Sequence, residues 1–120
     1  KIMLKNIRCY SFHGCLKEET AIGSDYRVDL SVNADLKKSA KTDQLKDTVD
    51  YVLLNRVVKE EMSIPSKLLE NVARRIIASV FKVEPRVKKC SVQITKLNPP
   101  INGDAVGVSV KLTQKKDSKF

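Results

Sequence analysis

Apolar and polar residues alternate without a break from Tyr26 to Leu36, which is the pattern of a strand that buries one face. The same two-residue period recurs at three other places, around Ile2–Cys9, Cys90–Ile94 and Val106–Leu112. Four strands are therefore predicted. Because the longest alternating segment has eleven residues, it would span about 36 Å, roughly twice the length of a common strand. The sheet is expected to be unusually tall.

Between the second and third predicted strands the period becomes helical. Ser66 is a plausible N-cap for the longer helix, and Pro85 prevents its continuation. The apolar residues on one face of this helix are Leu68, Leu69, Val72, Ala73, Ile76, Ile77, Val80 and Phe81. An earlier helix is predicted from Asp50 to about Met62, before Pro65. The element order ββααββ indicates an α+β fold.

A four-stranded antiparallel sheet with two helices on one face has a polar second face and two unpaired edges. Long exposed edges favour pairing with another chain, so a homo-oligomer is expected, with the polar face lining the enclosed space. Residues 1–113 are predicted to form a single domain. Residues 114–120 form a polar segment that is expected to fray.

The composition is that of a globular protein. The chain has 120 residues, of which 42% are hydrophobic and 31% charged, a balance that supports a packed core. Its apolar runs are shorter than the roughly 18 residues of a membrane span, and no leader pattern is seen, so neither membrane insertion nor export is expected. Three cysteines without paired spacing fit a reducing compartment, which favours a cytoplasmic protein.

The formal net charge of +9 raises the alternative of a nucleic-acid-binding module. The basic residues, however, are scattered in short groups. The chain also has only three tyrosines, three phenylalanines and no tryptophan, so aromatic platforms for bases are scarce. A solvated basic surface is therefore favoured over a nucleic-acid interface.

Few residues suit the common catalytic patterns. His13 is the single histidine, which excludes a zinc site built from three imidazoles of one chain, and its spacing to Cys9 and Cys15 matches no common zinc pattern. His13 could equally be a turn residue bonded to nearby backbone. Lys96 lies at a predicted strand end before the stiff Pro99-Pro100 pair, but it could simply be solvated. Glu70 could be a first-turn acid that complements the helix dipole.

Four short motifs in this order and spacing resemble the dihydroneopterin aldolase family, from Ile2 to about Leu112. They are Phe12-His13-Gly14 with Glu19 and Ile22-Gly23; Thr42-Asp43 with Asp47-Thr48-Val49-Asp50-Tyr51; Lys67-Leu68-Leu69-Glu70; and Thr95-Lys96 with Asn98-Pro99-Pro100-Ile101 and Gly103. The resemblance implies the ββααββ T-fold, or tunnelling fold, assembled into an oligomeric barrel of four or eight chains. It also implies retro-aldol cleavage of 7,8-dihydroneopterin in folate synthesis, with no metal, no Schiff base and no cofactor.

The resemblance also implies roles for single residues. Glu70 matches the carboxylate that pairs with the pterin ring, and Leu69 and Val49 match residues that position the ring. The catalytic residues would be Lys96, Tyr51 and Glu19: a lysine that accepts a proton once desolvation lowers its pKa, a tyrosine that protonates the intermediate, and an acid near the substrate side chain. Glu70, Lys96 and Glu19 would share each site with Val49 and Tyr51 of a neighbouring chain.

The chain departs from the family pattern at Ser11, where glycine is common, at Asn102, where proline is common, and in a short 103–106 segment. These departures concern loop shape and substrate scope. A pterin epimerase and a catalytically silent T-fold scaffold remain alternatives. The zinc-dependent T-fold enzymes are disfavoured by the single histidine.

Overall fold

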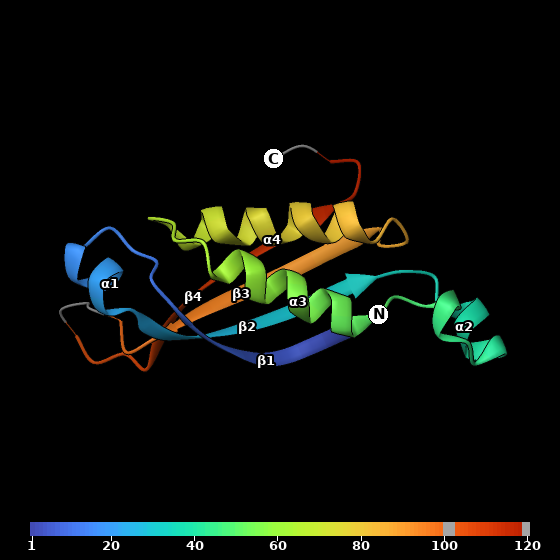
Figure 1. Cartoon of the computed structure of the whole chain (residues 1–120), viewed down its shortest axis with the longest axis horizontal. Helices are drawn as coiled ribbons and strands as arrows, with labels where there is room; N and C mark the ends of the chain where they lie inside the picture. The colour runs from blue at the N-terminus through green and yellow to red at the C-terminus, as the bar shows by residue number, and fades with distance from the viewer. Residues whose placement is uncertain (100–102, 119–120) are drawn as a thin grey trace.

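The computed structural model describes residues 1–99 and 103–118, and its centre is one four-stranded sheet (Figure 1). The strands lie in the order β1-β2-β3-β4, and each neighbouring pair is antiparallel. The four predicted strands and the α+β class are thus confirmed. Their bounds are β1 Ile2–Ser11, β2 Ser24–Asn33, β3 Lys89–Leu97 and β4 Gly107–Lys115.

Two helices, α3 (Tyr51–Met62) and α4 (Leu69–Val83), cover one face of the sheet, as predicted (Figure 1). Three shorter elements were not predicted: α1 (Lys17–Ile22), α2 (Lys37–Thr42) and the 3-10 turn η1 (Leu45–Asp47). None of the three buries a residue. They therefore have no apolar stripe from which a helical period could be read.

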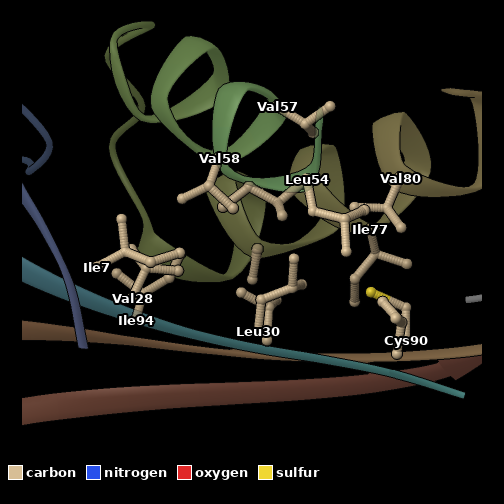
Figure 2. Close-up of a cluster of buried hydrophobic side chains, with 14 of the residues drawn as sticks. Ile7, Val28, Leu30, Leu54, Val57, Val58, Ile77, Val80, Cys90 and Ile94 are labelled. Atoms are coloured by element: carbon tan, nitrogen blue, oxygen red, sulfur yellow. The ribbon is translucent and has the colours of Figure 1, made fainter. Parts of the chain in front are cut away.

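The core lies between the covered face of the sheet and the two helices. Figure 2 shows side chains of the sheet directed toward those of α3 and α4. The labelled members include Val28, Leu30, Cys90 and Ile94 from the strands, and Leu54, Val58, Ile77 and Val80 from the helices. Burial of each large aliphatic side chain contributes about 1.5–3 kcal/mol, so this layer stabilises the fold.

Strand β2 ends earlier than the alternation suggests. It was predicted to continue to Leu36, but its last pair in the ladder with β3 is Asn33 with Lys89. Beyond that pair the neighbouring strand has ended, and Leu36 instead precedes the first turn of α2. The alternating pattern therefore extends past the point at which the partner strand is available.

The start of α3 agrees with the prediction, because Asp50 caps the helix by accepting a hydrogen bond from the Val52 N–H at 2.9 Å. The predicted cap of α4 is wrong. This helix begins at Leu69, after Leu68, and the backbone N–H of Ser66 donates instead to the His13 ring. The Ser66 hydroxyl, which would supply the cap, donates to the Asn71 side chain and accepts from Arg75.

Strands β1 and β4 form the two edges of the sheet, so each has one strand neighbour within the described part of the chain. The pairing of β1 with β2 is interrupted by a register shift between Leu4 and Ile7. β4 continues to Lys115, followed by a short turn, and the division of the chain at residue 113 stays a prediction. Among the described residues, no helix is long and apolar enough to cross a membrane.

Candidate active site

A cavity of about 330 Å³ lies where three distant parts of the chain meet. The loop after β1 and helix α1 supply His13 to Leu16 and Glu19, the start of α4 supplies Lys67 to Glu70, and the sheet supplies Lys96, Val108 and Val110. A larger hollow of about 600 Å³ lies beside Lys115–Ser118, but all of its lining residues are exposed. Only the smaller of these two contains a buried charged pair.

Lys96 lies on the covered face of the sheet because of the two-residue period of β3. Val92 and Ile94 of the same strand point into the core, and Lys96 continues their face to the end of the strand. It is 6% exposed, and a buried ammonium requires a partner. That partner is the carboxylate of Glu19, with which Lys96 forms a hydrogen-bonded ion pair.

The backbone around α1 holds Glu19 in this position. One carboxylate oxygen, Oε1, accepts a hydrogen bond from the Leu16 N–H at 3.2 Å, while Oε2 accepts from Lys96. Gly14, with a φ of +143°, lies against the same side chain. A Cβ at Gly14 would come within 2.5 Å of Glu19 Cδ, so only glycine leaves room for the carboxylate there.

The pair stabilises its own charged form. Burial opposes ionisation of Glu19, but the hydrogen bonds from Lys96 and Leu16 hold its pKa below the ordinary value. Burial likewise favours the neutral amine of Lys96, yet the Glu19 carboxylate raises the pKa of Lys96 above its ordinary value. Desolvation by itself lowers the pKa of Lys96, as expected, but the net pKa is raised, so the condition for a neutral amine near pH 7 is not met while Glu19 is paired with it.

The carbonyl oxygen of His13 is a second acceptor for Lys96. It accepts from Lys96 Nζ at 3.2 Å and from the Tyr26 hydroxyl at 3.1 Å. Tyr26 lies directly opposite Lys96 in the β2–β3 ladder and is 1% exposed. The sequence analysis missed Tyr26 as a site residue, because it begins the alternation of β2 and so has the pattern of an ordinary core residue.

The His13 ring ties the loop after β1 to the connection between α3 and α4. Its Nδ1 accepts from the Ser66 N–H at 3.1 Å, and the Gly14 N–H donates to the Ser66 carbonyl at 2.9 Å. The backbone partner of the ring was expected nearby in sequence, but it lies 53 residues away. Burial and the charges of Arg75 and Lys96 lower the pKa of His13 to about 4. The ring is thus neutral at pH 7.

Leu69 and Glu70 line the cavity from the first turn of α4, as the sequence analysis placed Glu70. Glu70 is exposed in the single chain, so its carboxylate is available to a ligand. The described residues contain no group of three or more His, Cys, Asp or Glu side chains that could hold a metal ion. Pro100 and Asn102, named for the loop after β3, lie outside the described residues.

Val49 and Tyr51 are not in this cavity. Thr48, next to Val49, accepts a hydrogen bond at 2.8 Å from Arg86, which follows the end of α4. Glu70 is at the other end of that helix, which is about 22 Å long for 15 residues. Figure 1 shows the start of α3 near the end of α4, with α1 at the opposite end of the molecule. Val49 is buried, whereas Tyr51 is 61% exposed.

Comparison with known proteins agrees with this arrangement. Residues 2–113 match the family FolB, dihydroneopterin aldolase. The dihydroneopterin aldolase of Bacillus subtilis (strain 168) is 35% identical over 117 residues, which cover 97% of this chain and 98% of the relative.

Two solved structures show the fold. A putative dihydroneopterin aldolase (FolB) from Vibrio cholerae O1 biovar El Tor has a TM-score of 0.86 at 22% identity, covering 95% of each chain. The E. coli dihydroneopterin aldolase in complex with neopterin has a TM-score of 0.81 at 18% identity, covering 92% of this chain and 96% of that one. The ββααββ arrangement is therefore the T-fold of these proteins. Since the family match spans nearly the whole chain and the Bacillus subtilis relative aligns almost end to end, this chain belongs to the dihydroneopterin aldolase family.

Proposed function

We propose that this chain cleaves 7,8-dihydroneopterin by a retro-aldol reaction to 6-hydroxymethyl-7,8-dihydropterin and glycolaldehyde, a step in folate synthesis. The observation that carries the proposal is the ion pair of Lys96 and Glu19 in a cavity that the exposed Glu70 also lines. Membership of the family and the neopterin complex of the E. coli enzyme support a pterin as the ligand.

Glu70 is proposed to bind the ring. The guanidine-like edge of a pterin presents two neighbouring N–H groups, and an exposed carboxylate can accept both in parallel, charge-assisted hydrogen bonds. Leu69 precedes it on the same helical turn and lines the cavity. We assign Leu69 to packing against the ring, so that the substrate side chain lies toward Lys96.

Lys96 and Glu19 are proposed to move the first proton. The pair takes up the proton of the hydroxyl on the side-chain carbon that becomes the aldehyde of glycolaldehyde. The bond from that carbon to the carbon attached to the ring breaks at the same time. The electrons of that bond enter the C=N bond of the dihydropterin ring, which becomes an enamine. Because the substrate supplies this electron sink, the proposal includes neither a Schiff base nor a metal. Binding of substrate must also separate Lys96 from Glu19, since the carboxylate raises the pKa of Lys96 and so favours the ammonium.

Tyr51 is proposed to return a proton to the enamine carbon from a neighbouring chain, with Val49 beside the ring. Within one chain these residues lie about one helix length from Glu70, so a single chain cannot complete the site. The two open sheet edges supply the surfaces for a tetrameric ring, alone or doubled to an octamer. We place the enzyme in the cytoplasm, where the free thiols of Cys9, Cys15 and Cys90 would stay reduced.

Incubation of the purified protein with 7,8-dihydroneopterin, followed by separation of the products, tests this function. Equal amounts of 6-hydroxymethyl-7,8-dihydropterin and glycolaldehyde are expected. Release of an epimer without glycolaldehyde would instead assign an epimerase, because reversal of the same cleavage inverts the side-chain carbon. Pterin binding without either product would indicate a silent scaffold.

A further inference from the structure

Tyr26 carries a hydroxyl in a place where the core does not need one. Its ring packs edge-on against the His13 ring, with centroids 5.3 Å apart, and the residue is 1% exposed. A phenylalanine would fill the same space, whereas a buried hydroxyl costs free energy unless it finds a partner. The partner it finds is the His13 carbonyl, which Lys96 already uses.

The geometry brings the phenol and the ammonium to one acceptor. A carbonyl oxygen has two lone pairs, and here one receives the Tyr26 O–H at 3.1 Å and the other receives Lys96 Nζ at 3.2 Å. Lys96 Nζ also lies 5.7 Å from the centroid of the Tyr26 ring. The amine thus contacts the Glu19 carboxylate and the His13 carbonyl, and the Tyr26 hydroxyl bonds to that same carbonyl.

We propose that Tyr26 is a positioning residue of the lysine site, whose phenol sets where the Lys96 amine lies and how firmly it holds its proton. The proposal rests on the proposed function and adds to it a residue from β2 that the family motifs do not contain. Tyr26 does not line the cavity, so it acts on substrate only through Lys96.

The charges around Lys96 support this role. Burial raises the pKa of Tyr26, with only partial opposition from Lys96, so the phenol stays protonated and acts as a fixed dipole. Burial lowers the pKa of Lys96 and the hydrogen bond of Glu19 raises it. The Tyr26 side chain comes next and also raises the pKa of Lys96, which favours the ammonium. The other titratable groups that line the cavity are the His13 ring, Cys15, Lys67 and Glu70. Removal of the phenol should therefore make Lys96 easier to deprotonate.

Tyr26→Phe tests the proposal, with Tyr10→Phe as the matched control. Tyr10 also donates a hydroxyl to a carbonyl, that of Ile22 at 2.6 Å, but it lies outside the lysine cavity. Lysine-labelled protein without substrate is titrated by NMR, and the Lys96 signal is assigned with Lys96→Arg. In Tyr26→Phe the Lys96 midpoint should fall by about half a pH unit or more, and in Tyr10→Phe it should not move.

Turnover supplies the second readout. Tyr26→Phe should lower kcat about tenfold and leave KM within about twofold, because the phenol acts on the amine and not on substrate binding. An unchanged Lys96 midpoint overturns the proposal, and so does an unchanged kcat where the wild type cleaves substrate. If the wild type cleaves nothing, the proposed function fails, while the midpoint still decides whether Tyr26 controls Lys96. If Tyr26→Phe does not fold, 4-fluorophenylalanine at position 26 fills the space of the hydroxyl without its O–H and with a much weaker acceptor, and the Lys96 midpoint should fall likewise.

Discussion

Lys96 and Glu19 form a nearly buried ion pair although 77 residues separate them in the sequence. Their side chains are 8% and 14% exposed, which shields the pair from screening by solvent. Glu19 comes from a six-residue helix and Lys96 from the end of a core-facing strand. The proposed chemistry therefore depends on the way the loop after β1 folds over the end of the sheet.

Loss of the Lys96 amine should remove turnover and leave binding. Lys96→Ala is expected to lower kcat by about 10²-fold or more, the scale of a general acid or base, with the pterin Kd changed only a few-fold. Lys96 should not form an imine, since the substrate carries its own C=N bond. Mass spectrometry after borohydride treatment with substrate should thus show an unmodified protein. A reduced lysine adduct would contradict this mechanism.

The Glu19–Lys96 pair should stabilise the fold over a defined pH window. The folded-state pKa of Glu19 is lowered, so its contribution is present above its ordinary value of 4.5 and is lost as pH falls through the folded value. The pKa of Lys96 is raised, so its contribution is present below 10.5 and is lost as pH rises through the folded value. Between these limits, Glu19→Gln should lower the free energy of unfolding by roughly 1–3 kcal/mol in urea titrations.

Glu18→Gln is the matched control for that measurement. Glu18 is the exposed neighbour of Glu19 on α1 and should change stability by less than about 0.5 kcal/mol. Equal losses in the two variants would show that the Lys96 pair adds nothing beyond the charge of helix α1.

His13 should stay neutral until the solution is strongly acidic. Its pKa in the fold is about 4 against an ordinary value of 6.5, so the unfolded chain binds more protons between these values. Stability is then lost as pH falls from 6.5 toward 4, by at most about 3 kcal/mol from this residue. Because the chain has one histidine, its ring resonance in NMR gives the midpoint directly. A midpoint near 6.5 would contradict the buried, Ser66-bonded ring, and His13→Gln should flatten the stability profile over this range.

Glu70 should supply affinity. Glu70→Ala is expected to weaken pterin binding by roughly 2 kcal/mol, about 30-fold in Kd, since one carboxylate holds two N–H groups of the ring. Calorimetry or fluorescence titration measures this. Glu60→Ala is the control, because Glu60 is exposed on α3 and only pairs with Arg56 at 3.9 Å. Wild-type affinity in Glu70→Ala would return Glu70 to the role of a first-turn acid that complements the helix dipole.

Two inactive variants should complement each other if the site is shared between chains. Tyr51→Phe and Glu70→Ala chains, unfolded together, refolded and assayed at a substrate concentration far below the Kd of Glu70→Ala, should recover activity that neither parent shows there. Random mixing of equal amounts leaves roughly a quarter of the interfaces with both residues intact. Native mass spectrometry confirms the mixed assemblies. Mixed rings that are no more active than their parents would show that both residues serve a site within one chain.

Local pattern was sufficient for the strands and for the two helices that cover the sheet. The two-residue and helical periods predicted all four strands and both covering helices, because each period reports which face of an element is buried. The predicted ends of elements were wrong where a contact with another part of the chain determines the end. β2 stops at Asn33 because β3 begins its ladder there, and Ser66 caps no helix because its hydroxyl bonds to the side chains of Asn71 and Arg75 instead of to a backbone N–H of α4.

Some residues of the site could likewise be named from the sequence, and others only from the structure. The motifs named Glu19, Leu69, Glu70 and Lys96, and the structure brings these four residues to one cavity, while their roles stay predictions. Tyr26 could not be recognised from its pattern. An aromatic residue in the alternation of a buried strand gives the same sequence signal whether or not its hydroxyl takes part in a site. The ionic form of Lys96 was also beyond the sequence, because burial alone favours the neutral amine. Tertiary contacts with Glu19 and Tyr26 reverse that preference, and such contacts depend on distances between residues that the chain order leaves undetermined.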